Sequence, residues 1–397
     1  MQMAGMFGKR VRAAILCDFA EENWPSMDLV ARVLWEKLQA EHSRKIDAVL
    51  VRPTFRRRFT QPSIVHSLPA MFNADRILNR FIDYPRALKR IRNQFDVFHL
   101  TDHSYSHLLH YLPNGRALVT CHDLDSFRCI LEPALEARSW PFRMMTRRIV
   151  EGLRKASTVA CVSETTRAQL LRYGLATAER ATTILNGVDA IFTPACNAEA
   201  DREAERLIGP AAPEAVEILH VGSTIPRKRI DVLLRVFAGI HEHFRAAKLI
   251  RVSGPFTASQ NALLGQLELE NATTVLPFVP TAILAALYRR AALVLITSEA
   301  EGFGLPMVEA MACGAAVVAS DIPALREVGS DAAWFTEQGD VDGMIRRALE
   351  VLRNRETDSV EALRQRERAI ANAARFSWTE CARQYAALYQ CVAESSI

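Results

Sequence analysis

Two glutamates at a fixed spacing are the first residues of this chain whose types suggest chemistry. Glu301 and Glu309 enclose the segment GFGLPMV, and the apolar segment 292–297 comes directly before them. A buried strand, a glycine turn and a helix that begins near Pro306 would explain this backbone, because glycine permits tight turns and proline fits the first helical turn. Amide N–H groups around Phe303 to Met307 could then bind phosphate. Since a carboxylate repels phosphate, we expect the glutamates to accept hydrogen bonds from hydroxyl groups elsewhere on the ligand.

Three successive basic residues, Arg227, Lys228 and Arg229, could neutralise that phosphate. They lie in HVGSTIPRKRID, whose pattern predicts a strand, a turn and a helix that begins at about Asp231. Cations beside a helix start can stabilise charge on a diphosphate leaving group. A nucleotide sugar carries both a diphosphate and vicinal hydroxyl groups, and the two segments together predict such a ligand. An exposed basic turn, with Glu309 only complementing the helix dipole, is the alternative on spacing alone.

The first half of the chain offers histidines and aspartates. His122 follows a predicted strand and is a candidate for ligand contact, with a purely structural role as the alternative. Asp123 and Asp125 have the D-x-D form that can hold a divalent cation. Because basic side chains already provide phosphate neutralisation, we expect no metal. Zinc at His103 and His107, which would be neighbours in a helix, would lack a third ligand.

The segment after the first predicted strand reads CDFAEENWPSMDLVARVL and contains no glycine. Ser26 is predicted to cap a helix whose apolar face includes Val30. We expect Trp24 to offer a platform for an acceptor molecule, and a tryptophan packed in the core is the alternative. Asp102 and His103 follow another predicted strand and are assigned, together with Trp24 and Ser26, to the acceptor side.

Short β-branched runs alternate with longer helical patterns, which predicts an α/β fold with doubly wound parallel sheets. The strand candidates are RAAILCDF, DAVLVRP, DVFHLTD, ALVTCHD, TVACVSE and ATTIL, followed by EILHVGS, AKLIRVSG, TTVLPFV, LVLITSE and AAVVASD. Polar residues after such strands line ligand sites. We predict an N-terminal Rossmann-like domain over 1–192, a proline-containing linker over 193–215 and a C-terminal Rossmann-like domain over 216–378. A last helix over 379–397 is expected to pack back toward the first domain.

Length and composition fit a two-domain soluble protein. The chain has 397 residues, more than one core usually holds, and its mean hydropathy is +0.01. Eight cysteines without a CxxC pair indicate the reducing cytoplasm. Residues 44–92 hold 12 Lys and Arg against three Asp and Glu, so we expect peripheral contact with the anionic inner face of a membrane, with a solvated surface as the alternative. No nucleic-acid recognition motif accompanies this charge.

The segment Glu301-GFGLPMV-Glu309 resembles the E-x7-E signature of retaining GT-B glycosyltransferases, in particular the family 4 group (glycosyl transferases group 1). Other segments resemble that family in the same order: VTCHDLD, CVSETTR, LNGVD, HVGSTIPRKRIDVLLRVF, FVPTAILAALYRRAALVLITS and FSWTECARQYAALY. The resemblance covers most of residues 96–395 and is weaker before residue 96. It implies a GT-B fold in which two Rossmann-like domains face a central cleft. It also implies retaining transfer of a hexosyl group from a nucleotide sugar to a glycan or lipid-linked acceptor, without a cofactor. GDP-mannose is favoured over UDP-glucose-type donors because the PRK turn is similar to those of many mannosyltransferases.

The resemblance implies roles for individual residues. His122, Lys228 and Glu301 are expected to act on the reacting part of the donor. The expected donor-binding residues are Gly222, Ser223, Arg227, Lys228, Phe303, Gly304, Leu305 and Glu309. An arginine often occupies the position of Ser223 in the family, so Arg227 is expected to supply the missing cation. Ser223 and the glycine-free first loop keep two rivals open: a GT-B-like nucleotide-sugar epimerase and an inactive nucleotide-binding scaffold subunit.

Overall fold

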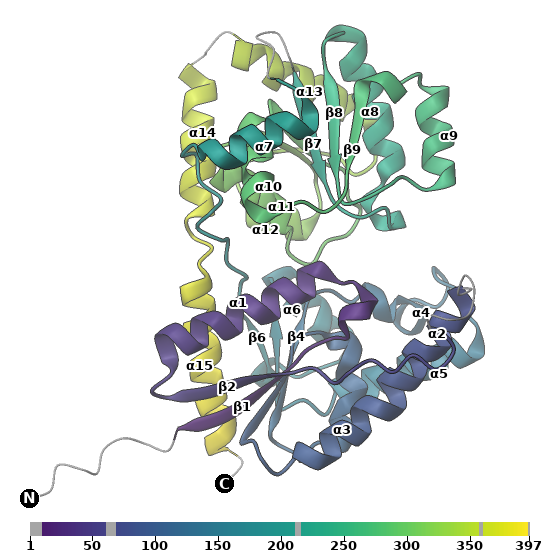
Figure 1. Cartoon of the computed structure of the whole chain (residues 1–397), viewed down its shortest axis with the longest axis vertical. Helices are drawn as coiled ribbons and strands as arrows, with labels where there is room; N and C mark the ends of the chain where they lie inside the picture. The colour runs from purple at the N-terminus through teal and green to yellow at the C-terminus, as the bar shows by residue number, and fades with distance from the viewer. Residues whose placement is uncertain (1–9, 61–68, 211–215, 357–359, 396–397) are drawn as a thin grey trace, which may run out of the picture. The chain divides into compact units, whose positions relative to one another are not determined.

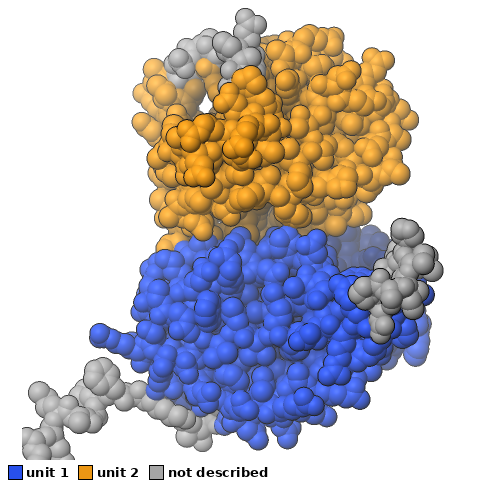
Figure 2. All heavy atoms as spheres, viewed as in Figure 1, with its two compact units in different colours: residues 1–186, 378–397 blue, residues 187–377 orange. Residues whose placement is uncertain are grey.

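The computed structural model describes residues 10–60, 69–210, 216–356 and 360–395, which divide into two compact units (Figures 1 and 2). Unit 1 consists of Met1–Asn186 together with Trp378–Ile397, and unit 2 of Gly187–Ser377. The chain therefore enters unit 2 once and returns to unit 1 for its last helix. Within the described ranges, no helix is long and apolar enough to cross a bilayer.

Unit 1 is built on a six-stranded parallel sheet with the order β2-β1-β3-β4-β5-β6, and it contains all six strands predicted for this half. The strands are β1 (Val11–Leu16), β2 (Ile46–Val51), β3 (Val97–Leu100), β4 (Ala117–Cys121), β5 (Thr158–Cys161) and β6 (Ala181–Thr183). The longer helices are α1 (Pro25–His42), α2 (Pro69–Leu78), α3 (Tyr84–Ile91), α4 (Arg128–Leu131), α5 (Trp140–Leu153), α6 (Glu164–Arg172), α15 (Trp378–Glu394) and the 3-10 helix η3 (His103–Tyr111).

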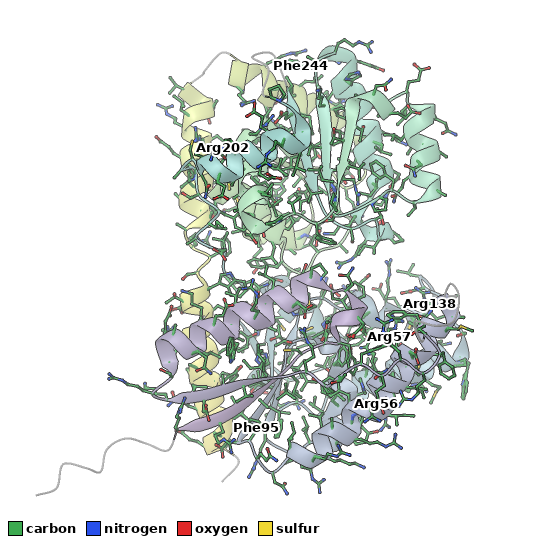
Figure 3. All side chains as sticks on the ribbon, viewed as in Figure 1. Arg56, Arg57, Phe95, Arg138, Arg202 and Phe244 are labelled. Atoms are coloured by element: carbon green, nitrogen blue, oxygen red, sulfur yellow. The ribbon has the colours of Figure 1, made fainter. Side chains whose placement is uncertain are left out.

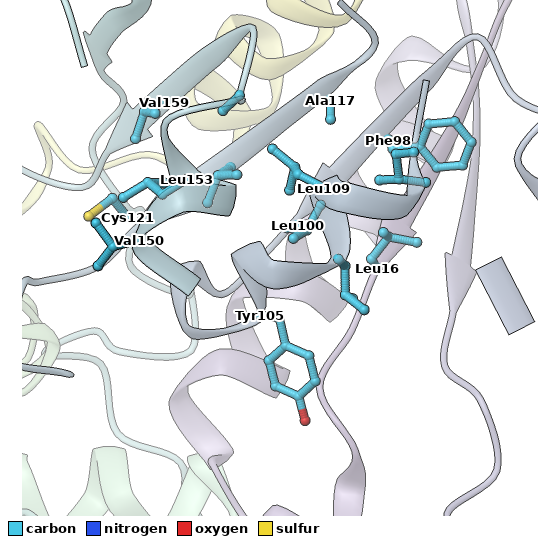
Figure 4. Packing of buried hydrophobic residues seen from close by; sticks show 14 of the residues in the cluster. Leu16, Phe98, Leu100, Tyr105, Leu109, Ala117, Cys121, Val150, Leu153 and Val159 are labelled. Carbon is cyan, nitrogen blue, oxygen red and sulfur yellow. The ribbon is translucent and has the colours of Figure 1, made fainter. Parts of the chain in front are cut away.

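Both faces of this sheet are buried, because successive side chains of a strand point to opposite faces. On β1, Ala13 and Ile15 belong to the cluster with α1 and α15, whereas Ala14 and Leu16 belong to the cluster with α3, η3 and α5. Figure 4 shows part of the second cluster, including Val150 of α5. The polar residues that follow the strands are left at the carboxyl edge of the sheet.

A chain of buried polar side chains fastens α15 to unit 1. The imidazole of His99 on β3 lies 2.6 Å from the Tyr389 hydroxyl and 2.7 Å from the Thr120 hydroxyl. Thr120 in turn lies 2.6 Å from the hydroxyl of Tyr385. Burial lowers the pKa of His99 to about 3, so the ring is neutral at physiological pH. These four side chains satisfy one another, as buried polar groups must.

Unit 2 is built on a second parallel sheet with the order β12-β11-β10-β7-β8-β9. Its strands are β7 (Glu217–Val221), β8 (Lys248–Val252), β9 (Thr273–Leu276), β10 (Leu293–Ile296), β11 (Val317–Ser320) and β12 (Trp334–Thr336). Its helices are α7 (Ala198–Ile208), α8 (Ile230–His243), α9 (Ala258–Gln266), α10 (Thr281–Arg290), α11 (Leu305–Ala312), α12 (Pro323–Gly329), α13 (Val341–Glu356) and α14 (Val360–Ala373). Helices α8, α9 and α13 share one core cluster with the sheet. The strand order reverses between β7 and β10.

The segment 193–215 differs from the predicted linker. It contains α7, which belongs to unit 2 and packs against α10 with Ala200 and Ala204 buried. The chain passes from unit 1 to unit 2 between Asn186 and Gly187. Alanine gives this helix a close contact surface without the large apolar residues that mark a core helix in sequence. The edge strand β12 was not predicted either, because its three residues are all only partly buried and it lacks the apolar run of a core strand.

Candidate functional site

Two loops of unit 2 meet at the carboxyl ends of β7 and β10, where the strand order reverses. One contains the 3-10 helix η6 (Pro226–Lys228) and leads into α8, and the other leads into α11. The amide of Glu299 donates to the carbonyl of Arg227 at 2.8 Å, and the hydroxyl of Thr297 donates to the carbonyl of Lys228 at 2.9 Å. Open parallel sheets bind ligands at such a reversal.

Lys228 and Glu301 form an ion pair where these loops meet. Nζ of Lys228 lies 2.5 Å from Oε1 of Glu301, which also accepts a hydrogen bond from the Ser298 hydroxyl at 2.7 Å. The two side chains are only 14% and 9% exposed. Burial alone would raise the pKa of Glu301, but the charges of Lys228 and Arg227 and the two hydrogen bonds lower it below its usual value. Glu301 is therefore ionised at neutral pH and compensates a cation of the loop.

The third basic residue of the loop has acidic partners of its own. Arg229 donates to the Asp231 carboxylate through two hydrogen bonds of 2.9 and 2.8 Å, and Glu299 lies 3.7 Å away. Arg227 instead donates from Nη1 to the carbonyl of Ala300 at 3.2 Å. The predicted run of three cations thus divides into two whose charges act on Glu301 and one that pairs with Asp231.

The start of α11 has the form expected from the sequence. Gly304 has a φ of +97°, a conformation that favours glycine, and a Cβ there would lie 2.6 Å from Cδ2 of Leu325. Within the described residues, the amides of Phe303, Gly304 and Leu305 donate to no backbone carbonyl. The amide of Met307, which the sequence suggested as a phosphate donor, instead donates to the carbonyl of Gly304 at 2.9 Å. The set of available amides is therefore Phe303 to Leu305.

Glu309 has a different environment from Glu301. It is 8% exposed on α11, and its Oε2 accepts a hydrogen bond from the hydroxyl of Tyr288 at 3.0 Å. Burial, with a further contribution from the charge of Asp189, raises the pKa of Glu309 to about 7. Its neutral and ionised forms therefore coexist near physiological pH.

Two buried basic side chains adjoin the turn of Gly222 and Ser223, and the sequence did not single out either. His220 on β7 and Arg251 on β8 are paired in register and are 2% and 0% exposed. Arg251 donates from Nη2 to the carbonyl of Gly222 at 2.9 Å and from Nη1 to the carbonyl of Gly254. Strands of parallel sheets are normally apolar throughout. The arginine near the end of the otherwise apolar segment KLIRV was therefore the sequence signal that could have identified Arg251.

In unit 1, His122 and His103 lie together at the carboxyl edge of the sheet. Nε2 of His122 is 2.7 Å from the carbonyl of Thr101, and the His122 amide donates to Nδ1 of His103 at 3.4 Å. Burial lowers the pKa of His122 despite the opposing charge of Asp102, so this imidazole is neutral. Asp102 caps η3, accepting from the amide and the hydroxyl of Ser104 at 2.7 and 2.6 Å.

The remaining acceptor-side residues lie at the start of α1. Trp24 is 46% exposed and is not packed in the core. The prediction that Ser26 caps the helix is wrong, because α1 begins at Pro25 with Trp24 in the cap position and no side-chain cap. Proline is pre-organised for the first helical position and sets this earlier start. The predicted apolar face is confirmed by the burial of Val30.

Asp18, directly beyond β1, is an acidic group that the sequence did not single out. It is 3% exposed, and neither carboxylate oxygen accepts a hydrogen bond from a described residue. Burial and then the charge of Asp102 raise the pKa of Asp18 well above its usual value. Nearby, Arg80 lies 3.4 Å from Glu22 and 4.0 Å from the ring centre of Tyr105.

The other candidate metal ligands have separate partners. His107 bonds the carbonyl of Arg80 at 2.8 Å, and His103 lies on the same 3-10 helix, where residues four apart do not align. The carboxylate of Asp123 accepts from the amide of Asp125 at 3.0 Å, which makes the D-x-D segment a local turn. Among the described residues, no three His, Cys, Asp or Glu side chains are grouped to hold a metal ion.

Two parallel sheets, one with cations and helix-start amides at its strand-order reversal, define a two-domain α/β protein with a candidate phosphate site. The family description "Glycosyl transferases group 1" matches residues 201–375, and "Glycosyltransferase Family 4" matches residues 30–192. The chain therefore belongs to the group 1 glycosyltransferases of the GT-B type, and it is an enzyme of that class.

Individual relatives agree with this assignment. The chain is 29% identical over 310 residues to the O-antigen chain mannosyltransferase B of Escherichia coli, covering 76% of this chain and 78% of that protein. Sucrose-phosphate synthase from Thermosynechococcus elongatus has a TM-score of 0.72 at 21% identity, covering 96% of this chain and 98% of that one. HepE of Anabaena, in complex with UDP-glucose, has a TM-score of 0.72 at 17% identity, covering 96% and 100%. The predicted GT-B fold with two Rossmann-like domains is confirmed.

Proposed function

We propose that this enzyme transfers a hexosyl group from a nucleotide sugar to a hydroxyl group of a glycan or lipid-linked acceptor, with retention of configuration. The observation that carries the proposal is the Lys228–Glu301 pair, 2.5 Å apart at the carboxyl ends of β7 and β10. The cation suits a diphosphate, and the carboxylate suits the hydroxyl groups of a sugar. The amides of Phe303 to Leu305 add neutral donors for phosphate oxygens.

In the proposed reaction, the bond between the anomeric carbon and the diphosphate oxygen breaks. The acceptor oxygen bonds to the same face of that carbon, and its proton passes to the leaving phosphate. Lys228 and Arg227 stabilise the negative charge that develops on the diphosphate. Glu301 accepts hydrogen bonds from the sugar and Glu309 from the ribose, while the neutral imidazole of His122 contacts the sugar. No metal or other cofactor takes part.

For the donor, we propose GDP-mannose. Its support is the similarity to a mannosyltransferase of Escherichia coli over most of both chains. A UDP sugar is the alternative, and HepE, whose structure contains UDP-glucose, is a fold relative. Calorimetry against UDP, GDP, ADP and their sugar conjugates, first in EDTA and then with Mg²⁺, separates these donors. We expect micromolar binding of one nucleotide in EDTA, because the loop supplies its own cations.

The reaction itself is tested by incubating the enzyme with the donor that binds and candidate acceptors, and analysing the products. Transfer to an acceptor supports the proposal. Free sugar or a rearranged donor as the main product would favour the epimerase, and an unchanged transfer rate in Glu301→Gln would contradict the assigned role. Binding that strictly requires Mg²⁺ would instead favour a divalent cation held by Asp123 and Asp125.

We also propose peripheral contact with an anionic membrane at the cytoplasmic face. Part of the basic segment 44–92 is occupied within the protein, since Arg58 pairs with Asp83 at 2.8 Å. Figure 3 shows Arg56, Arg57 and Arg138 toward the same end of unit 1, and Trp140 of α5 is 74% exposed. Cations with exposed aromatics suit a membrane surface. Co-sedimentation with vesicles containing phosphatidylglycerol, but not with purely zwitterionic vesicles, is the expected result.

A further inference from the structure

Arg251 is a buried charge without an acidic partner. Its side chain is 0% exposed, and it makes no ion pair with any carboxylate of the described residues. Its partners are the carbonyls of Gly222 and Gly254 and the ring of Phe256, whose centre is 4.9 Å from the guanidinium carbon. Its Nε donates to no described group. Burying an uncompensated charge is costly, so a selected role for this residue is expected.

The charge persists in this environment. Burial lowers the pKa of Arg251 to about 10, which is still far above neutral pH. The neighbouring His220 carries no charge, because burial and then the charges of Arg251 and Lys228 lower its pKa to about 3. The buried pair of basic side chains therefore contributes one positive charge, and Arg251 carries it.

Arg251 lies directly behind the loop that we assign to the diphosphate. It pairs in register with His220, and it holds the carbonyl of Gly222, the first residue after β7. A Cβ on Gly222 would lie 3.3 Å from Cε1 of His220 and 3.7 Å from the side-chain carbons of Lys228. The side chains of His220 and Lys228 thus both approach Gly222, and Arg251 bonds its carbonyl.

The charges of the loop suggest what Arg251 contributes to the site. Glu301 compensates Lys228, and Asp231 compensates Arg229. Two of the three positive charges of the turn are therefore neutralised by carboxylates. Ser223 adds no charge. We propose that Arg251 is a positioning residue for the donor: it fixes the turns at Gly222 and Gly254 and supplies a positive charge behind them for the diphosphate. This inference rests on the proposed function and adds a residue to it.

The test compares ligands that differ only in the diphosphate. Kd is measured for UDP and GDP and for uridine and guanosine, with wild-type protein, Arg251→Gln and Arg251→Lys. In Arg251→Gln, which is neutral, we expect the diphosphate-bearing ligand to bind about tenfold more weakly while its nucleoside changes less than twofold. In Arg251→Lys, which keeps the charge, the ratio of the two affinities should stay within about threefold of wild type.

Each variant can overturn the inference by itself. Equal weakening of nucleoside and diphosphate would show a purely structural role, and so would a loss of the affinity ratio in Arg251→Lys as large as in Arg251→Gln. An unchanged ratio in Arg251→Gln would also contradict it. If Arg251→Gln does not fold, Arg251→Lys still tests the inference. A tenfold fall in its ratio of diphosphate affinity to nucleoside affinity would show that the positive charge is not what matters. Wild-type protein that binds neither UDP nor GDP would instead overturn the proposed function as well.

Discussion

The carboxyl edges of the two sheets use ionisable side chains in opposite ways. In unit 2, Lys228 and Glu301 are ionised and adjoin backbone amides that donate to no backbone carbonyl of the described residues. In unit 1, His122 is neutral, burial raises the pKa of Asp18, and Asp102 is occupied as a helix cap. The same fold position therefore presents cations beside helix-start amides in unit 2, and in unit 1 a group of histidine and carboxyl side chains that are mostly bonded within the unit. This difference fits the proposal that the charged donor binds unit 2.

The largest effect on catalysis is expected from removing the cation of Lys228. Lys228→Met should lower kcat/KM at least 100-fold, about 2.7 kcal/mol, because it removes a cation from the leaving group. Steady-state kinetics of sugar transfer measure this change. Arg229→Met is the matched control, since Arg229 pairs with Asp231 and Glu299 instead of Glu301 and should change kcat/KM less than tenfold. Similar losses in both variants would mean that the run of cations acts only through its total charge.

Glu309 should give unit 2 a pH-dependent stability. Its folded-state pKa of about 7 exceeds the ordinary value of 4.5, so its contribution to folding is fully present below pH 4.5 and is lost as the pH rises through 7. The free energy of unfolding should fall by up to about 3 kcal/mol across this window from this residue alone. Urea unfolding between pH 5 and pH 8.5 measures the slope, which Glu309→Gln should flatten. An identical slope in that variant would place the titration elsewhere.

The polar chain in unit 1 should affect stability and leave the donor site unchanged. Tyr389→Phe leaves a nitrogen of buried His99 unpaired and should lower the free energy of unfolding by about 1–2 kcal/mol. Nucleotide affinity should not change. Tyr111→Phe is the control, because its hydroxyl receives a hydrogen bond from Arg148 at an exposed site and should cost less than about 0.5 kcal/mol. Equal costs would show that burial does not decide the value of these bonds.

The smallest effect on stability is expected at Trp24. It is 46% exposed at the start of α1, so Trp24→Ala should leave the unfolding transition and the nucleotide affinity almost unchanged. If this side chain is an acceptor platform, KM for the acceptor rises severalfold while KM for the donor stays constant. Kinetics with each substrate varied in turn separate the two values, and an unchanged acceptor KM would remove Trp24 from the site.

Sequence periodicity was sufficient to predict most strands of the two sheets. It was not sufficient to predict contacts between residues far apart in the sequence. Eleven of the strands could be read directly, because strands buried on both faces form short apolar runs. The three-residue β12 and the alanine-based contact of α7 gave no comparable signal. A helix start was misplaced by two residues, because the predicted cap was Ser26 and the observed cap position is Trp24, before Pro25.

The candidate site shows the same limit. The spacing of Glu301 and Glu309 suggested two similar carboxylates, but Lys228 lowers one pKa and burial raises the other. Such a difference depends on residues 73 positions apart meeting in space, as Lys228 and Glu301 do. Arg251 was overlooked for a related reason, because one arginine in an apolar strand does not reveal that its partners are two carbonyl groups.

The return of α15 to unit 1 has a consequence for biosynthesis. Tyr385 and Tyr389 complete the network of His99, although nearly 300 residues of chain separate them from it. On a ribosome, unit 1 emerges first but waits for its last helix, whereas unit 2 is continuous in sequence and has all its strands once residue 336 has emerged. The unit made first is therefore expected to finish folding last, and its exposed β1 and β3 surface would need protection from aggregation during that interval.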